Sequence, residues 1–290
     1  MKIGITADCS SGLEYFPHKH TVQITRTTIN FCDEVLIDGV DITADEFYDK
    51  LIKTNIIPST SAPTTGEILK SIEYYKSLGY TDVIHFPISF NLSTYGQNLK
   101  ASISELIEGI NYHVYNSNSA TILQGYIAYY AEKLAKMGYD VETIFSECDK
   151  LRKNSDAFLV VDDLKYLVKN GRLSAAAGFI GNLARIKPIL RLSEEGKIVP
   201  FEKVRTHSKA IQRMLELVKQ RSEGYKKVLY IVLHTARLED ASLIAEQIKG
   251  NTPNANRVEV ATITPTVGAH IGSGIIGIGR IVLDDLIDVL

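Results

Sequence analysis

Short apolar runs alternate with segments of helical spacing along most of this chain. Consecutive apolar residues predict buried strands over 2–7, 83–89, 113–115, 157–161, 228–234 and 258–264. Apolar residues that recur every three or four positions predict helices over 43–54, 64–78, 97–110, 119–137, 141–155, 207–221 and 238–249. This alternation of strands and helices is typical of an α/β architecture with a largely parallel sheet.

Residues 188–206 follow a different pattern. Two apolar stretches, 189–192 and 198–204, flank a Glu-Glu-Gly-Lys turn and predict an antiparallel hairpin. A chain of 290 residues is long enough for two domains of ordinary size. We therefore expect an N-terminal parallel-sheet α/β domain over residues 1–156 and a C-terminal α+β domain over residues 157–290.

Composition restricts the class of protein. Apolar residues make up 45% and charged residues 23% of the chain, as in soluble globular proteins. Three widely spaced cysteines argue against a disulfide framework and against a structural zinc site. Residues 260–279 lack charge but contain a proline and five glycines, which are typical of a loop and not of a membrane helix. We expect a cytoplasmic protein with no metal and no nucleic-acid partner.

Several loops that follow predicted strands are rich in hydroxyl side chains, and ligands of parallel sheets bind beyond the C-terminal ends of the strands. Asp8 and Ser10 follow the first strand, where they could cap a helix or form the wall of a site. Farther along, Thr64 with Glu67 three residues later matches a capping box. A capping box accounts for Thr64 and Glu67 but assigns no structural role to Thr60 and Ser61.

Two later loops add further candidates. Ser93 and Thr94 follow the predicted strand 83–89, and Ser93 could also be only a helix cap. His270 lies among glycines in residues 268–274, which we expect to form a loop that brings the imidazole close to a ligand, although a single histidine is often structural. The GxGxxG match over 272–277 does not indicate a dinucleotide site, because it does not follow a first strand.

Residues 164–193 contain six positive side chains and no acid, in a chain of net charge −2. These side chains are Lys165, Lys169, Arg172, Arg185, Lys187 and Arg191. Such a block indicates an anionic partner or a docking surface, or else a solvated basic face. The chain has no P-loop motif and no other cofactor motif.

Five short motifs occur in one order along the chain. They are Asp8-Cys9-Ser10, Thr60-Ser61-Ala62-Pro63-Thr64, Leu92-Ser93-Thr94-Tyr95-Gly96, Leu164 to Ser174 leading to Ile186-Lys187-Pro188-Ile189-Leu190, and Ala269-His270-Ile271-Gly272-Ser273-Gly274. Together they resemble the DegV family, the bacterial fatty-acid-binding proteins, over essentially the whole chain.

The chain departs from the family motifs at four positions near the expected site. Thr94 replaces a glycine, Asn170 replaces the first glycine before Arg172, Ser273 replaces a proline, and Ala269 replaces a threonine. These changes affect the identity of the ligand more than the fold.

The resemblance implies a two-domain protein that holds a long-chain fatty acid in an apolar tunnel between its layers, without a cofactor and without enzymatic activity of its own. It also implies that a separate ATP-dependent fatty acid kinase subunit phosphorylates the bound carboxylate. From the family match and the hydroxyl-rich loops we expect the carboxylate to be bound by Thr60, Ser61, Ser93, Thr94 and His270. From the basic block we expect Arg172, Lys169 and Lys165 to dock the kinase or, transiently, membrane phosphates.

Two other functions fit some of the same residues. In a hydrolase of small acyl esters, Ser61 or Ser93 would be the nucleophile and His270 its base. The chain has no GxSxG elbow, and Asp8 would have to supply the acid. A binder of sugar or nucleotide phosphates would use the hydroxyl loops together with Arg172.

Overall fold

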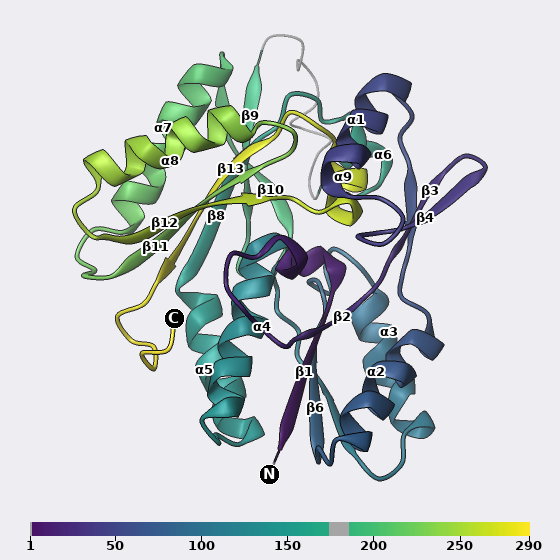
Figure 1. Ribbon diagram of the computed structural model, residues 1–290. Coiled ribbons are helices and arrows are strands. Elements are labelled where there is room, and N and C mark those ends of the chain that lie inside the picture. Colours follow the sequence, from purple (N-terminus) through teal and green to yellow (C-terminus); the bar gives the residue numbers. More distant parts are fainter. Residues whose placement is uncertain (1, 174–185) are drawn as a thin grey trace.

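The N-terminal half of the chain is built on a parallel sheet. The computed structural model describes residues 2–173 and 186–290 (Figure 1). Four parallel strands lie in the order β2 (Gln23–Thr25), β1 (Ile3–Asp8), β6 (Asp82–Phe86) and β7 (Asn111–Val114). All the residues of β1 and β6 are buried, which explains their continuous apolar runs.

Helices cover both faces of this parallel sheet. In Figure 1 the helices α2 (Thr65–Ser77) and α3 (Tyr95–Ser102) lie on one side, and α4 (Thr121–Lys136) and α5 (Val141–Lys153) lie on the other. Most side chains of α4 are buried, since this helix packs on the parallel sheet and also belongs to the core that the two halves share. The helix is therefore apolar nearly all the way round.

The C-terminal half contains a six-stranded mixed sheet. Its order is β10 (Ile198–Val204), β9 (Lys187–Leu192), β8 (Ser155–Val160), β13 (Ile276–Val282), β11 (Val228–His234) and β12 (Ala255–Thr262). Only the β11–β12 pair is parallel. Tyr230 and Val232 face α7 (His207–Arg221) and α8 (Leu238–Asn251), whereas Leu229, Ile231 and Leu233 belong to the shared core. Burial on both faces explains the continuous apolar run of β11 before His234.

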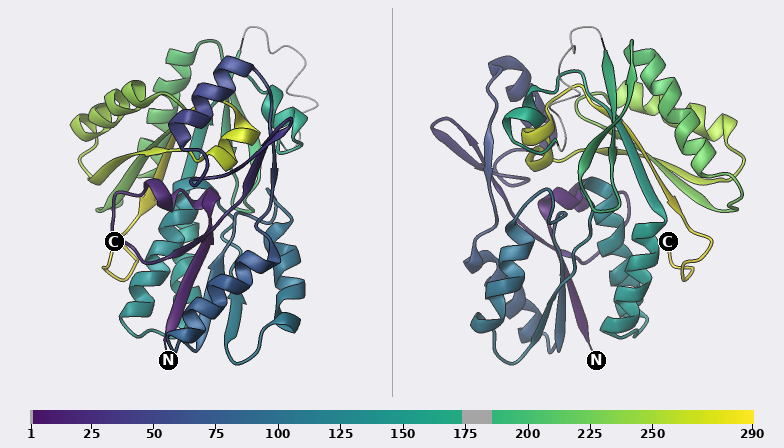
Figure 2. Two further views of the ribbon diagram at one scale, coloured as in Figure 1. Left: turned by 45° about the vertical axis from the view of Figure 1, so that its right-hand side comes forward. Right: turned by 180° about the vertical axis from the view of Figure 1, so that it is seen from behind.

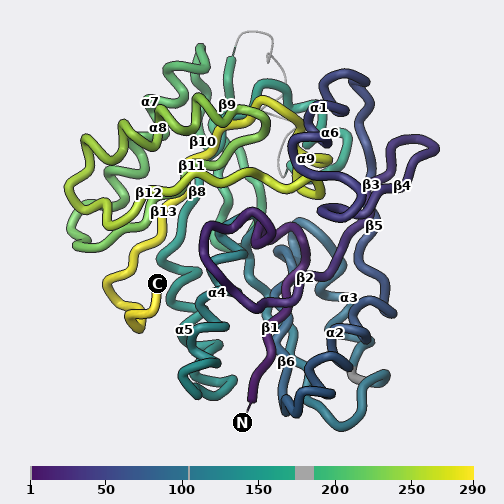
Figure 3. The backbone as a smooth tube through the Cα atoms, in the orientation of Figure 1, coloured from purple at the N-terminus to yellow at the C-terminus, as the bar shows by residue number. Residues whose placement is uncertain are grey.

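A small third sheet connects the two halves. Strands β4 (Glu34–Ile37), β3 (Thr28–Phe31) and β5 (Ser59–Ser61) pair in that order, and the β3–β4 hairpin projects from the body of the molecule (Figures 2 and 3). Helix α1 (Ala44–Thr54) and the strands β3 and β5 contact the short helix α9 (Pro265–Ile271), which also contacts α6 (Lys165–Lys169). Segments from opposite ends of the sequence therefore meet at α9.

The mixed α/β architecture and the predicted hairpin are confirmed, and each predicted strand and helix has its counterpart in the structure. A prediction was wrong at residues 268–274, which we expected to be a loop: residues up to Ile271 belong to α9. Strands β2 to β5 and β13 were not predicted, because the first four are very short and Gly277 and Gly279 interrupt the apolar pattern of β13. The domain boundary after residue 156 stays a prediction, close to the start of β8.

The uncharged segment 260–279 forms the end of β12, all of α9 and the first part of β13. None of the helices in the described ranges combines the length and the apolar character that a membrane crossing requires.

A comparison of two helical glycines tests the packing of α4. A Cβ atom at Gly125 would lie 2.4 Å from the carbonyl oxygen of Ser11, whereas a Cβ at Gly250 in α8 would meet nothing within 4 Å. We expect Gly125→Ala to lower the free energy of unfolding by about 1–3 kcal/mol through overpacking. Gly250→Ala should leave it unchanged or raise it by up to about 1 kcal/mol. Urea unfolding of both variants measures the difference, and equal stabilities would contradict the close approach at Gly125.

Candidate functional site

A cavity of about 500 Å³ lies between the two halves of the molecule. Its size is within the range of about 300–1,000 Å³ that is usual for small-molecule sites. Most of its wall is apolar and comes from both halves, including Leu92, Leu99, Leu123, Leu159, Leu233 and Ile263. A ligand in this space would be surrounded mainly by hydrocarbon.

Five of the side chains that were expected to bind the carboxylate or to dock a partner line this cavity, although they are spread over more than two hundred residues. They are Thr60, Ser93, Thr94, Arg172 and His270. Thr60 comes from β5, Ser93 and Thr94 precede α3, and His270 stands in the last turn of α9. The fold thus brings together hydroxyls, an imidazole and a guanidinium on an otherwise apolar wall.

A hydrogen bond joins Thr60 to His270. The Oγ1 atom of Thr60 lies 2.8 Å from Nε2 of the imidazole, while Nδ1 is buried and has no partner within the described part of the chain. Burial and, to a smaller extent, the positive charge of Arg172 together lower the pKa of His270 to about 4. The imidazole is therefore neutral at pH 7.

Ser61 does not join this group. Side chains alternate across a strand, so Thr60 and its neighbour in β5 point to opposite sides. Ser61 is exposed, and its hydroxyl accepts a hydrogen bond of 3.2 Å from the Asn30 side chain. The expectation that Ser61 contacts a ligand carboxylate disagrees with this placement.

Arg172 lies in the cavity wall and not on an open docking face. Its Nε donates to the carbonyl of Leu92 at 3.3 Å, and its Nη1 donates to the carbonyl of Asn170. Within the described lining of the cavity, Arg172 is the one permanently charged cation. Its charge therefore acts on whatever occupies this end of the cavity.

The rest of the basic block is largely neutralised. Lys165, Lys187 and Arg191 pair with Asp163, Asp162 and Asp156 at 3.0–3.1 Å. Lys169 is exposed and forms no ion pair with any described residue, whereas Arg185 lies outside the described residues. Acids just before residue 164 and Asp156 therefore compensate part of the positive charge of this block.

The loop after β1 serves both of the roles considered for it. One oxygen of Asp8 accepts from the Ser10 backbone N–H at 3.0 Å as an N-cap, and the other accepts from the Ile88 N–H at 2.8 Å. Asp8 and Ser10 also line the cavity. Burial raises the pKa of Asp8 above its ordinary value, although these hydrogen bonds oppose the shift.

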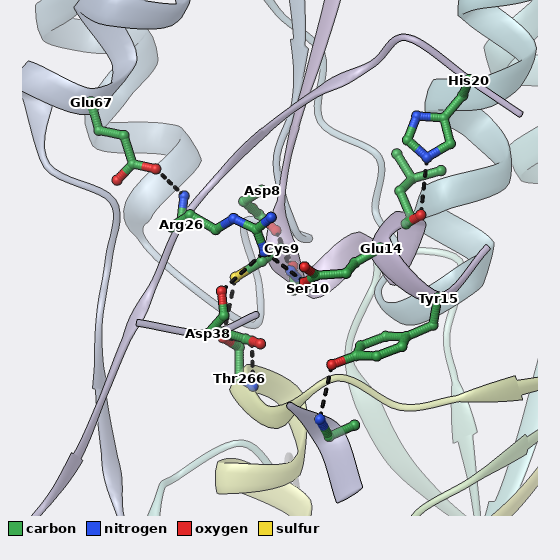
Figure 4. Close-up of polar contacts among 12 residues, drawn as sticks. Asp8, Cys9, Ser10, Glu14, Tyr15, His20, Arg26, Asp38, Glu67 and Thr266 are labelled. Carbon is green, nitrogen blue, oxygen red and sulfur yellow. Dashed lines mark hydrogen bonds and ion pairs between the residues drawn. The ribbon is translucent and has the colours of Figure 1, made fainter. Parts of the chain in front are cut away.

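The predicted capping box at Thr64 is only half formed. The Thr64 hydroxyl accepts from the Glu67 N–H at 3.2 Å, but the Glu67 carboxylate accepts from the backbone N–H of Arg26 instead of returning to Thr64 (Figure 4). Glu67 thus ties α2 to the segment between β2 and β3.

Sequence reasoning missed a second polar patch of the wall. The hydroxyls of Thr27 and Thr266 line the cavity, and the Asp38 side chain lies between Cys9 and Thr266 (Figure 4). Oδ2 of Asp38 accepts from the Thr266 N–H at 2.8 Å, and the Cys9 sulfur is 3.2 Å from the Thr266 hydroxyl. The available signal was Pro265 at the first position of α9, a common helix start.

The geometry disfavours a serine hydrolase. His270 bonds to Thr60 and not to a serine, and the Ser93 hydroxyl accepts from the Tyr95 N–H at 3.3 Å. No described carboxylate orients the ring through Nδ1, and Asp8 is engaged with Ser10 and Ile88. A nucleophile, a base and an orienting acid do not meet here.

The GxGxxG match also has the wrong context for a dinucleotide. Gly272 ends α9, and the segment then leads into β13, so a helix precedes a strand. Dinucleotide sites need the reverse order, with a strand leading into a helix.

Comparisons with known proteins agree with this geometry. Residues 2–282 match the family model described as "Uncharacterised protein, DegV family". A DegV domain-containing protein of Staphylococcus aureus (strain COL) is 33% identical over 284 residues, which are 97% of this chain and 98% of that protein. The structure of a fatty acid binding DegV family protein from Streptococcus agalactiae is similar, with 28% identity, a TM-score of 0.87 and coverage of 97% and 99% of the two chains.

A third neighbour shares the fold alone. It is a fatty acid kinase protein of Streptococcus pneumoniae, called Fak B3 and solved loaded with linoleic acid. It is 21% identical to this chain, with a TM-score of 0.80 and coverage of 97% and 100% of the two chains.

The low pKa of His270 predicts how the free energy of unfolding depends on pH. A histidine whose pKa is about 4 when folded and about 6.5 when unfolded contributes stability that is present above pH 6.5 and is lost as the pH falls through 4. Relative to His270→Gln, the parent protein should lose on the order of 3 kcal/mol of unfolding free energy between pH 7 and pH 4. Urea unfolding at several pH values measures this, and parallel pH profiles would contradict a neutral buried imidazole.

Proposed function

The chain belongs to the DegV family, and we propose that it binds a long-chain fatty acid in the cavity between its two halves. The observation that carries this proposal is an apolar cavity of about 500 Å³ whose wall gathers hydroxyls, an imidazole and a guanidinium. That arrangement matches an amphiphile with a hydrocarbon tail and one small anionic head group. The related protein of Streptococcus agalactiae is described as fatty acid binding, which supports the same ligand here.

The head group would be held by Thr60, Ser93, Thr94 and Arg172. A carboxylate that leaves water needs hydrogen-bond donors, since its ionised form is otherwise strongly destabilised. If the neutral ring of His270 donates from Nε2 to Thr60 Oγ1, the Thr60 hydroxyl proton is free to point at the carboxylate. The charge of Arg172 offsets that of the ligand at the same end.

The tail would supply most of the affinity. Burial of each CH₂ group is worth about 0.8 kcal/mol, so a dozen or more carbons outweigh a few hydrogen bonds to the head group. The polar residues then set the orientation of the ligand, with the carboxylate beside Thr60 and His270.

The second part of the proposal is that a separate ATP-dependent kinase subunit phosphorylates the bound carboxylate. The chain has no P-loop motif, so ATP would come with the partner. Thr94 lines the cavity and is also exposed, so that the head group would lie near the surface. The likeness to the Streptococcus pneumoniae protein extends to the fold alone, and this step therefore rests on the motif resemblance and the position of the site.

The docking surface for the kinase would centre on Lys169, which is exposed and close to Arg172 in the sequence. Because Arg172 lines the cavity, we assign it to the head group and not to the docking surface. Lys165 is a weaker docking candidate because it pairs with Asp163. The expected contact with membrane phosphates loses its basis, since three of the basic side chains are paired with acids. A cytoplasmic location fits the three free cysteines.

The head-group site can be tested with a matched pair on one strand. Thr60→Val removes a hydroxyl that lines the cavity, whereas Ser61→Ala removes one from the opposite face of β5. The loss of one hydrogen bond to a charged group should weaken fatty-acid binding about tenfold or more in Thr60→Val. Ser93→Ala should weaken it in the same direction, and Ser61→Ala should bind like the parent in a fluorescent fatty-acid titration.

Native mass spectrometry of the purified protein separates this function from hydrolysis. A co-purified fatty-acid mass supports the proposal, while a protein that binds no fatty acid and turns over a model ester would favour the hydrolase. Equal affinities of Thr60→Val, Ser93→Ala and Ser61→Ala for fatty acid would contradict the placement of the carboxylate at the Thr60 end of the cavity.

Reversal of one surface charge tests the kinase step. Lys169→Glu should lower the rate of acyl-phosphate formation with a fatty acid kinase partner by about tenfold, because it replaces attraction at the docking surface with repulsion. Fatty-acid affinity should not change. Lys219→Glu on α7 is the matched control, since this lysine is also exposed and unpaired in the described chain but lies on the far side of the six-stranded sheet. Equal rates for both variants would exclude Lys169 from docking.

A further inference from the structure

A fully buried carboxylate holds the beginning of the helix that bears His270. Asp38 lies in the loop between β4 and α1 and has no exposed surface. Its Oδ2 accepts hydrogen bonds from both the backbone N–H, at 2.8 Å, and the hydroxyl of Thr266, in the first turn of α9 (Figure 4). The first N–H groups of a helix lack partners within the helix and carry positive partial charge, so a carboxylate stabilises them.

This contact reaches the site through the geometry of α9. Thr266 and His270 are four residues apart, so they lie on the same face of the helix, and both line the cavity. The helix has only seven residues, so a shift at its first turn moves its last turn as well. The position of the imidazole against Thr60 therefore depends on a residue far away in the sequence.

Other contacts hold α9 against α1. The Tyr48 hydroxyl donates to the carbonyl of Ile263 at 2.8 Å, just before the helix. A Cβ atom at Gly268 would lie 2.5 Å from the same hydroxyl, so the helix packs closely on α1. These contacts fix the distance between α9 and α1, whereas Asp38 fixes the register of the first turn.

We infer that Asp38 is a positioning residue for the proposed fatty-acid site: its carboxylate fixes α9 so that His270 meets Thr60 beside the ligand carboxylate. The role in ligand binding rests on the proposed function. The coupling between Asp38 and His270 does not, because it can be measured in the protein without a fatty acid.

The ionised state of Asp38 is costly, which supports a role beyond packing. Burial raises its pKa to about 6, and its second oxygen has no partner in the described chain. The titratable and charged groups that face it are Cys9, Glu14, Tyr15, Arg26 and Tyr48. Only the guanidinium of Arg26 among these is a cation, and it donates to the backbone carbonyl of Asp38 and to Glu14.

The sign of the pH dependence follows from this shift. A carboxyl whose pKa is about 3.8 when unfolded and about 6 when folded favours the folded state in its protonated form. The stability that Asp38 contributes is therefore lost as the pH rises from about 4 to 6. At pH 7 the neutral variant Asp38→Asn should be at least as stable as the parent and yet have a displaced α9.

The experiment reads the His270 ring directly. NMR of the ring protons in the protein without ligand, assigned by comparison with His270→Gln, should show an inflection near pH 6 in the parent and none in Asp38→Asn. At pH 7 the same variant should bind a fluorescent fatty acid about tenfold more weakly. Asp41→Asn is the matched control, since its carboxylate is exposed, accepts from the Ile37 N–H in the same loop and makes no described contact with α9.

A second pair decides the question if Asp38→Asn folds poorly. Thr266→Ser keeps the hydroxyl and should preserve the His270 signal, whereas Thr266→Val should displace it. An unchanged ring signal and affinity in Asp38→Asn, or in Thr266→Val, would overturn the inference. If the parent binds no fatty acid at all, the proposed function fails, but the ring signal still reports on Asp38.

Discussion

The contact between Thr60 and His270 is the constraint on which the site depends. It joins β5, near the N-terminal end of the chain, to α9, near the C-terminal end, on the wall of an apolar cavity. A carboxylate in such a cavity is stable only where donors are concentrated, because hydrocarbon walls offer none. The neutral imidazole is well suited to this place, since it can orient a hydroxyl without adding a second buried charge next to Arg172.

The architecture explains how one cavity can be reached from two halves of the chain. The parallel sheet and the mixed sheet share α4 as a common layer, and the space between them is lined by leucines from both. The small sheet β4–β3–β5 and α1 extend from the N-terminal half to cover α9 in the C-terminal half. The polar end of the cavity is therefore assembled from both halves, and neither half alone contains both Thr60 and His270.

The sequence predicted those parts of the fold and site that have a local signature. Strands such as β1, β6 and β11 are buried on both faces, so their apolar runs are unmistakable. The hydroxyls that follow strands were proposed by the same logic, and Thr60, Ser93 and Thr94 line the cavity. Ser61 lies away from the cavity wall, and the sequence could not show this, since the face of a three-residue strand depends on its pairing with β3.

The net charge of the basic block was overestimated for a different reason. Its acid-free span began at residue 164, and the two acids immediately before it, Asp162 and Asp163, supply partners for Lys187 and Lys165. A count of charges within residues 164–193 misses these ion pairs, because the acidic partners lie just outside that range. The Asp38–Thr266 contact was beyond any such count, because its partners are 228 residues apart and meet only through the packing of α1 on α9.

Burial has opposite energetic effects on the neutral imidazole of His270 and on the ionised carboxylate of Asp38. Burial favours the neutral imidazole of His270, so that group stabilises the fold toward neutral pH, whereas burial opposes the ionised Asp38. A neutral acceptor at position 38 would avoid this cost, because the charged hydrogen bonds to Thr266 do not remove the cost of burying the charge. The carboxylate has an advantage for the register of α9, since a charged acceptor holds the first turn of a short helix more firmly than an amide does. The same register of α9 sets the direction of the His270 ring. The contact between Asp38 and Thr266 at one end of the helix therefore supports the hydrogen bond between His270 and Thr60 at the other.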